Sequence, residues 1–471
     1  MSKSTTLGIV ILTCCVPTLL LHAEDASNKD LDRQYQLAVS NYDSGKYAEA
    51  AGQLEKLLPY ATKSSPVHEL LGMIYVSLSQ QDKAIEQLKV AVQLKPDWAE
   101  ARTNLGAALL QSGKTALAEE QFKKAVSLEP TNYDANHNLA EFYVGSGKVT
   151  EALPLFERAY AIDPAAYDNG YDLALAEFQV GHADKSRAVA MDLAKSNNTG
   201  ELHNLLGHLE EKQGDYVAAA NDYETATHLD PSEDNFFDWG CEMLMHRTYE
   251  PAITIFEEAA RRYSSSPRIL IGLGLSLYAR GKYDDAVSNL LNAVTLNPGD
   301  PRGYTFLSEA YESSPAQTQE VIEAFKKYSE TQPTNALAQY DYAMSLWKGY
   351  RQESASFDRS AVESLLLKAI ALDDSLADAH EQLGNLYSDQ REYAKSAPQY
   401  KRALELNPNS ADAHYRLGTD YVHLGQKDEA QEEFAVYQKL RAEHLDELEK
   451  QRAEVRQFVY SESATPGPKK Q

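Results

Sequence analysis

The chain has 471 residues, of which 43% are hydrophobic and 24% charged, with a formal net charge of −25. This hydrophobic content is enough to bury a core and excludes a chain that is disordered throughout. The acidic balance excludes nucleic acid and argues against anionic lipid as partners, because both are bound through lysine and arginine that replace counterions.

Residues 1–23 have the pattern of a secretory signal peptide. Lys3 gives a positive start, the run from Leu7 to Leu21 is apolar, and Ala23 precedes Glu24. We therefore expect cleavage after Ala23 and export, either to the periplasm or out of the cell. The apolar run is shorter than the ~20 residues that a membrane span needs. The alternative is an uncleaved N-terminal anchor, and only then would the protein associate with a membrane. Residues 24–30 are predicted to be a short linker.

Small residues then recur at steps of 33 or 34. Each follows a leucine or tryptophan, and the series is Gly72, Gly106, Ala140, Ala174, Gly207, Gly240 and Gly274, with Gly384 and Gly418 further on. Other positions keep the same period. Glycines such as Gly113 and Gly147 fall near the middle of each unit, alanines such as Ala118 and Ala152 follow them, and prolines such as Pro130 and Pro164 close units. A fixed period of this length indicates a repeat architecture.

One unit shows what the period encodes. Residues 99–111 have apolar side chains at helical spacing, and Gly113 suits the left-handed conformation in which helices end. Residues 116–129 form a second predicted helix, on which alanines flank Phe122 and permit a close helix crossing. Pro130 lacks a backbone N–H and ends the hairpin. Each unit is therefore predicted to be a helix-turn-helix hairpin.

This combination resembles the tetratricopeptide repeat (TPR) family over residues 31–444, in about twelve units. The resemblance implies an all-α, right-handed superhelical solenoid whose concave groove is lined by the first helix of each unit. We place the unit starts at Leu31, Ser65, Ala99, Tyr133, Tyr167, Gly200, Glu233, Pro267, Pro301, Ala336, Ala377 and Ala411.

Two regions depart from the period. The tenth unit is about seven residues too long, and we expect an extended loop from Tyr350 to Arg359. The stretch from Asp428 to Tyr460 contains no proline or glycine, which predicts a long helix. Its part at 445–460 is predicted to cap the last hairpin, with a dimerising helix as the alternative. Residues 461–471 are predicted to be a disordered tail. The sequence leaves the oligomeric state open.

The sequence contains no zinc-protease, phosphate-loop or Cys-x-x-Cys motif. His380 and His414 stand at equivalent repeat positions, which a shared structural role explains better than metal binding. Residues 1–23 include Cys14 and Cys15, so Cys241 is the one cysteine left after cleavage and no intramolecular disulfide is expected. We predict no catalytic, cofactor or metal site, and hence no enzyme.

The resemblance implies that the second, fifth, ninth and twelfth residues of each unit face the groove. These positions are mostly polar in the third, fourth, sixth and eleventh units, where they include Glu100, Asp134, His137, Glu201 and Asp378. In the seventh, eighth and tenth units they are apolar, and we predict partner contacts at Phe237, Leu244, Ile271, Leu275, Tyr278, Tyr340, Met344 and Trp347. The alternative is that these side chains pack within or between repeats.

These patterns predict a scaffold or adaptor that holds a peptide or a partner helix in its groove, outside the cytoplasm. One competing class is a structural subunit of an envelope secretion or polysaccharide-export assembly that works through its outer surface. The other is an enzyme with an unfamiliar site.

Overall fold

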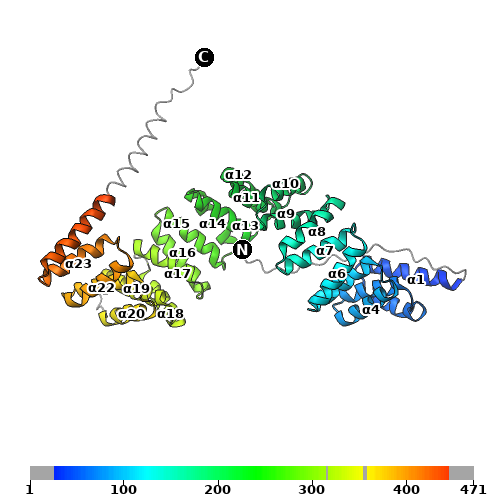
Figure 1. Cartoon of the computed structure of the whole chain (residues 1–471), viewed down its shortest axis with the longest axis horizontal. Coiled ribbons are helices and arrows are strands. Elements are labelled where there is room, and N and C mark those ends of the chain that lie inside the picture. The colour runs from blue at the N-terminus through cyan, green and yellow to red at the C-terminus, as the bar shows by residue number, and fades with distance from the viewer. Residues whose placement is uncertain (1–25, 315–316, 354–357, 445–471) are drawn as a thin grey trace, which may run out of the picture. The chain divides into compact units, whose positions relative to one another are not determined.

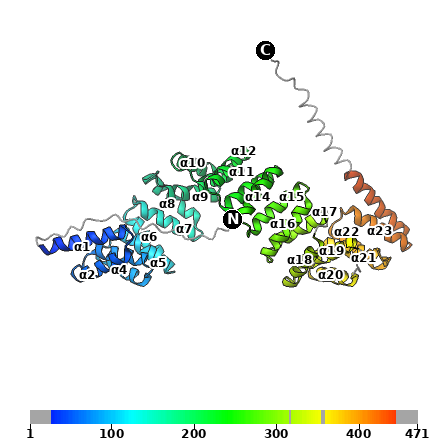
Figure 2. The same ribbon diagram turned by 180° about the vertical axis from the view of Figure 1, so that it is seen from behind.

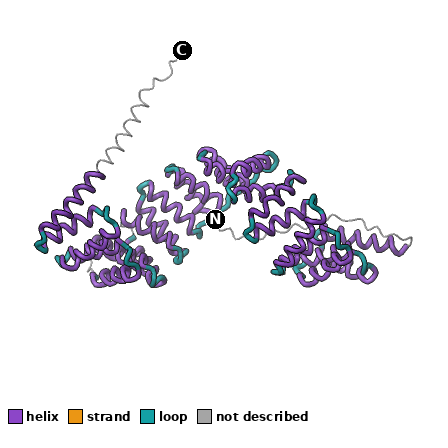
Figure 3. Tube along the Cα trace, in the orientation of Figure 1, coloured by secondary structure: helices purple, strands orange, loops and turns teal. Residues whose placement is uncertain are grey.

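The computed structural model describes residues 26–314, 317–353 and 358–444. Within these ranges the chain is helical and contains no strand (Figure 3). The predicted signal peptide, the predicted capping helix at 445–460 and the predicted tail at 461–471 lie outside the described residues. The predicted linker at 24–30 overlaps a helix, because α1 begins at Ala26.

The chain divides into two compact units between Asn235 and Phe236. Figures 1 and 2 label the helices of both units. The helices of the first unit are α1 (Ala26–Asp43), α2 (Tyr47–Leu57), α3 (Ser65–Ser77), α4 (Gln81–Leu94), α5 (Ala99–Gln111), α6 (Thr115–Leu128), α7 (Tyr133–Gly145), α8 (Val149–Ile162), α9 (Tyr167–Gln179), α10 (Ala183–Ala194), α11 (Gly200–Gln213) and α12 (Tyr216–Leu229), with a 3-10 turn at Leu58–Tyr60.

Helix α13 (Glu233–Met245) contains the boundary between the two units. The helices that follow are α14 (Tyr249–Arg262), α15 (Pro267–Ala279), α16 (Tyr283–Leu296), α17 (Pro301–Ser313), α18 (Thr318–Thr331), α19 (Ala336–Glu353), α20 (Arg359–Leu372), α21 (Ala377–Ser388), α22 (Tyr393–Leu406) and α23 (Ala411–His423). Residues 427–444 are also helical. The described helices therefore form about twelve consecutive hairpins, which confirms the predicted all-α repeat array.

Within a hairpin, the glycine of the first helix receives a large side chain from the second. A Cβ atom built on Gly106 of α5 would lie 2.8 Å from the Phe122 ring of α6, and one on Gly207 of α11 would lie 2.8 Å from the Tyr223 ring of α12. Ala118 and Ala125 flank Phe122 and have no exposed surface. The short distance between the paired helices therefore requires a small residue at these repeat positions.

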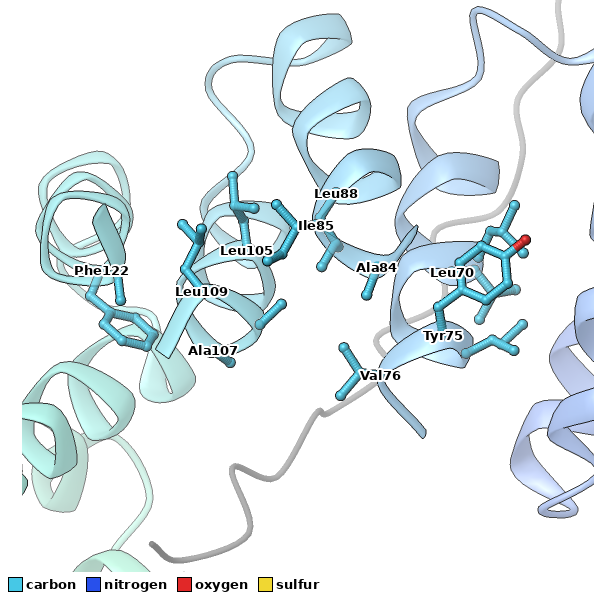
Figure 4. Close-up of a cluster of buried hydrophobic side chains, with 14 of the residues drawn as sticks. Leu70, Tyr75, Val76, Ala84, Ile85, Leu88, Leu105, Ala107, Leu109 and Phe122 are labelled. Carbon is cyan, nitrogen blue, oxygen red and sulfur yellow. The ribbon is translucent and has the colours of Figure 1, made fainter. Parts of the chain in front are cut away.

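The apolar core runs from one repeat into the next. Figure 4 shows part of the first unit's cluster, in which Ile85 of α4 and Leu105 of α5 lie next to one another across the seam between two repeats. Each hairpin alone would expose this surface, and stacking buries it.

The turn between the paired helices needs one residue in the left-handed region. Gly113 fills it with φ +72° after α5, and seven repeats in the described chain use glycine there. Four repeats place a residue with a side chain at this point, and these residues are Ser79, Arg247, Gln317 and Arg391.

The tenth repeat accommodates its extra residues differently from the expectation. The sequence predicts an extended loop from Tyr350 to Arg359, but α19 continues as far as Glu353 and α20 begins at Arg359. This first helix has 18 residues, whereas α17 has 13. Lys348 near the end of α19 donates a hydrogen bond to the Tyr311 carbonyl oxygen and lies 3.7 Å from Glu312. The lengthened helix is thus fastened to α17 of the preceding repeat.

Candidate functional site

Several first helices of neighbouring repeats contact one another within each unit. In the first unit α3 contacts α1 and α5, α5 contacts α7, and α9 contacts α11; in the second, α15 contacts α17 and α21 contacts α23. We call the surface made by the second, fifth, ninth and twelfth residues of these helices the inner face. All eight predicted partner contacts belong to it by position.

Seven of the eight predicted residues are half-buried, on α13 (Phe237, Leu244), α15 (Ile271, Leu275, Tyr278) and α19 (Tyr340, Met344). Trp347 is the exception, with 6% of its surface exposed. It packs in a cluster with Val362 and Leu366 of α20 and with Leu383 of α21. In this structure Trp347 is a core residue, because the first turn of α20 and the next repeat cover it.

The structure separates the predicted contacts into two patches. The α13–α15 patch consists of Phe237, Leu244, Ile271, Leu275 and Tyr278, and three of these residues (Phe237, Ile271 and Tyr278) pack against one hydrophobic cluster. Tyr340 and Met344 border another, together with Trp347. The inner-face residues of α17, which comes between them in the chain, are polar: Arg302, Thr305, Glu309 and Glu312. The sequence suggests that the seventh to tenth repeats hold one apolar segment, whereas the structure gives two apolar patches.

The α13–α15 patch combines anchored rings with unanchored aliphatic side chains. The Phe237 ring meets the Phe256 ring edge-on at 6.3 Å, and the Arg268 guanidinium lies 5.1 Å above its centre. Tyr278 contacts Tyr283, with 5.5 Å between ring centres. Leu244 and Leu275 are half-buried, but neither belongs to a core cluster of the described chain. They are the members of the patch whose apolar surface contributes least to the fold.

Tyr340 has a different environment. Burial raises the pKa of Tyr340 far above its ordinary value, and the nearby carboxylates of Asp378 and Asp341 raise it further. Asp341 is 5% exposed, and burial raises its pKa to about 7, although Ser308 Oγ donates a hydrogen bond of 3.2 Å to its Oδ1. Tyr340 is therefore a neutral phenol within an acidic part of the inner face.

The inner face of the first unit is acidic and partly buried. Glu69 of α3 is 2% exposed, and Asn104 Nδ2 of α5 donates a hydrogen bond of 2.6 Å to its Oε1. Burial, and then the neighbouring Glu100, raise the pKa of Glu69 to about 8. At neutral pH this carboxyl group is therefore mostly protonated, and it joins two consecutive repeats as a neutral group.

One group of three side chains on this face has the composition of a metal site. His137 and Glu141 of α7 and Asp172 of α9 each offer a ligand atom, and these atoms lie within 4.8 Å of one another. Burial lowers the pKa of His137, and burial followed by the neighbouring aspartates raises the pKa values of Glu141 and Asp172 to about 7. No other such trio of His, Cys, Asp and Glu occurs among the described residues.

The sequence does not identify this trio. It places His137 among the polar groove residues and predicts no metal site. His137, Glu141 and Asp172 occupy the fifth, ninth and sixth positions of their repeats, so no spacing within one helix links all three. The signal available in the sequence is the His-x-x-x-Glu pair on α7, which places both side chains on one helix face. That Asp172 of α9 lies close to this pair is seen only in the structure.

Four other histidines have a shared structural role, in agreement with the expectation for His380 and His414. Each stands at the fourth position of the first helix of its repeat. One ring nitrogen contacts the second helix of that repeat, and the other contacts the segment that precedes the first helix. His380 Nδ1 lies 2.9 Å from Gln399 Oε1, nineteen residues further on, and the Asp374 carbonyl oxygen accepts from Nε2 at 3.3 Å. The residues with this arrangement are His68, His203, His380 and His414.

Two further features bear on the expectations from sequence. Cys241 is half-buried on α13. Among the helices of the described residues, none combines the length and the low polarity that crossing a bilayer requires.

Sequence patterns of known families match much of the chain. A pattern described as TPR repeat matches residues 72–113 and 384–425. Three patterns described as tetratricopeptide repeat also match: one at 103–167 and 238–301, one at 144–209 and one at 200–233. No curated protein matches the sequence.

Solved structures of repeat proteins resemble the chain in part. PilF of Pseudomonas aeruginosa is 18% identical with a TM-score of 0.42, and the match covers 46% of this chain and 100% of PilF. The C-terminal part of a TPR repeat-containing protein from Cytophaga hutchinsonii is also 18% identical, with a TM-score of 0.42, over 59% of this chain and 98% of that one. YrrB, described as a TPR protein with an unusual peptide-binding site, is 15% identical with a TM-score of 0.36, over 39% and 94%.

Proposed function

Because this chain belongs to the tetratricopeptide repeat family, we propose that it is a protein-binding scaffold that holds a partner on the inner face of its second unit. The contact surface is the α13–α15 patch, and the partner presents an apolar peptide segment or one face of an amphipathic helix. Helix faces and extended segments are what such surfaces bind in general.

One observation carries this proposal: Leu244 and Leu275 keep apolar surface exposed without belonging to the core. Burial of apolar surface contributes about 25 cal/mol per Å², so half-buried leucines on two consecutive first helices are a source of binding energy. The fixed rings of Phe237 and Tyr278 add aromatic surface, which often dominates binding energy. Acidic side chains on the inner face of the first unit, such as Glu100 and Asp134, make that part less suited to an apolar partner.

The test replaces the two leucines by serine, in the variant Leu244→Ser/Leu275→Ser. Partners are captured by cross-linking in cells that make the full chain and are quantified by mass spectrometry. Leu296→Ser is the matched control, because Leu296 is 46% exposed on α16, a second helix of the same region. We expect the double variant to lose at least about tenfold of one captured partner, the equivalent of 1.4 kcal/mol. Equal capture by both variants, at equal thermal stability, would contradict the proposal.

A competing proposal uses the outer surface of the repeats. A depression of about 590 Å³ lies among second helices α6 and α8 and first helix α7, and its lining includes Lys123, Tyr143 and Arg158. A structural subunit that assembles through this side would keep its partners in the double-leucine variant. It would lose them in Lys123→Glu/Arg158→Glu, which reverses the charge of the depression.

We also propose that the protein is exported and works in the periplasm or outside the cell. The pattern at residues 1–23 supports this, with Lys3 before the apolar run and Ala23 before Glu24. N-terminal sequencing of the chain from its native cells should begin at Glu24. An N-terminus at Met1 in a membrane fraction would instead favour the uncleaved anchor.

A further inference from the structure

The geometry around His137 points to a binding site for a divalent transition-metal ion, with Zn²⁺ as the best-fitting ion, held between α7 and α9 by His137, Glu141 and Asp172. This site is in the first unit and is independent of the partner surface proposed for the second. Three observations carry it: a fixed imidazole, a lone pair directed at carboxylates, and ligands from two repeats.

The imidazole of His137 is held on three sides. Its ring stacks on Tyr133, with 5.7 Å between centres and 11° between planes, and it contacts the Phe156 ring at 5.9 Å. On the third side its Nδ1 lies 3.1 Å from Oδ1 of Asn169, a side chain with no exposed surface. A ring that is positioned in this way, with a polar partner on its far nitrogen, is typical of histidines that bind metals.

The position of Asn169 determines which nitrogen of His137 carries the proton. Asn169 Nδ2 donates a hydrogen bond of 3.1 Å to the Phe156 carbonyl oxygen, which can only accept. The Asn169 oxygen therefore faces His137, and Nδ1 must be the donor. In the neutral ring Nε2 is therefore unprotonated, and its lone pair is available to bind a metal ion.

The Nε2 atom is directed at carboxylates and not at a hydrogen-bond donor. Glu141 Oε1 is 3.8 Å from it, too far for a hydrogen bond, and an Asp172 oxygen lies within the 4.8 Å cluster. His137 is 8% exposed, so water provides little solvation for this arrangement. Three electron-rich groups that face one another in a partly buried place are stabilised by a cation between them.

The ligand set selects the class of ion. One imidazole with two carboxylates suits Zn²⁺ and similar transition metals, whereas Mg²⁺ and Ca²⁺ prefer oxygen ligands alone. Zn²⁺ binds these groups at roughly 2.0–2.2 Å, so ligand atoms in a tetrahedral site lie about 3.4 Å apart. The ligand atoms of the trio, which lie within 4.8 Å of one another, move closer together when they bind the ion. Three protein ligands leave one position open for water or for a group on a partner.

The experiment measures Zn²⁺ binding to the full chain without an affinity tag, by titration calorimetry after removal of metals with a chelator. We expect about one ion per chain and a higher melting temperature in its presence, because an ion at this site joins α7 to α9. Mg²⁺ should bind at least about a hundredfold more weakly, since it disfavours imidazole.

The decisive variants are Glu141→Gln and Asp172→Asn, which keep side-chain shape and remove one charge each. Each should weaken Zn²⁺ binding at least about tenfold without lowering the melting temperature of the metal-free chain, because neither removes a core contact. Glu309→Gln is the matched control, since Glu309 holds on α17 the repeat position that Glu141 holds on α7. Absence of saturable Zn²⁺ binding, Mg²⁺ binding of equal strength, or Zn²⁺ binding that survives both variants would overturn the assignment.

Discussion

Phe122 packs onto Gly106 so closely that a single methyl group added to the glycine would lie 2.8 Å from the ring. The same glycine-to-ring contact joins Gly207 to Tyr223 and Gly384 to Tyr400 in other hairpins. It follows that the recurring glycine in the sequence marks the crossing point of two helices and not a flexible hinge.

We expect Gly106→Ala to lower the free energy of unfolding by about 1–3 kcal/mol, the usual effect of overpacking a tight core. Gly52→Ala is the control, because Gly52 is also helical but a Cβ atom added to it would have no neighbouring atom within 4 Å. That change should be stabilising by about 0.5–1 kcal/mol, since alanine is the better helix former. Urea unfolding followed by circular dichroism measures both; a destabilisation of equal size in the two variants would show that helix propensity, not packing, decides the position.

This contact also explains why so much of the fold was predictable. The requirement for a small residue at Gly106, a large one at Phe122 and a helix end at Gly113 is local, and it repeats. About twelve weak local signals at one period identify the hairpin and show how many hairpins the chain contains. The tenth repeat departs from the expectation, because the sequence pattern at 350–359 does not show that α19 continues as far as Glu353.

The candidate sites were less predictable, for a related reason. The groove positions follow from the period, so the residues of the α13–α15 patch could be named from the sequence. Whether a side chain at a groove position is exposed depends on neighbouring repeats, and Trp347 is covered by α20 and α21. The trio at His137 requires the distance between α7 and α9, which the sequence does not contain.

The fourth-position histidines give a second prediction. His380→Ala removes the link between α21, Gln399 and the Asp374 carbonyl oxygen. Losing two hydrogen bonds of this kind should cost about 1–3 kcal/mol of unfolding free energy. His380→Arg should be close to neutral, because Arg102 forms the same link in its own repeat: its Nη1 donates to Gln121 at 2.9 Å and its Nε to the Pro96 carbonyl oxygen at 2.9 Å. Equal losses in the alanine and arginine variants, measured by thermal unfolding, would argue that the ring packing and not the link matters.

The turn that contains Ser79 gives a third prediction. Ser79 has φ +58° at the point where most repeats have glycine, and this conformation costs a residue with a Cβ roughly 1–2 kcal/mol. Ser79→Gly should therefore raise the free energy of unfolding by about 0.5–1 kcal/mol. Ser364→Gly, a change at an exposed position in the interior of α20, should lower it by a similar amount, because glycine is unfavourable within a helix. Opposite signs in chemical denaturation support the assignment of strain to the turn, and equal signs reject it.

Glu69 links stability to pH in a direction opposite to that of most carboxylates. Its pKa is raised from 4.5 to about 8 in the folded chain, chiefly by burial, so the folded state holds a proton that the unfolded state releases. Its stabilising effect is complete below pH 4.5 and is lost progressively as the pH rises to about 8. The cost at high pH is that of a charged carboxylate beside Glu100 and away from water.

Glu69→Gln keeps the acceptor for Asn104 Nδ2 and cannot ionise. We expect the variant to be about 1–3 kcal/mol more stable than the native chain at pH 8 and nearly equal to it at pH 4, where Glu69 is protonated in both states. Glu224→Gln, which removes one carboxylate at an exposed position on α12, is the control for the loss of a negative charge alone. Denaturation curves across this pH range measure the difference. A Glu69→Gln variant that is less stable at pH 8 would mean that the carboxylate is ionised in the folded chain, and that Asn104 stabilises its charge.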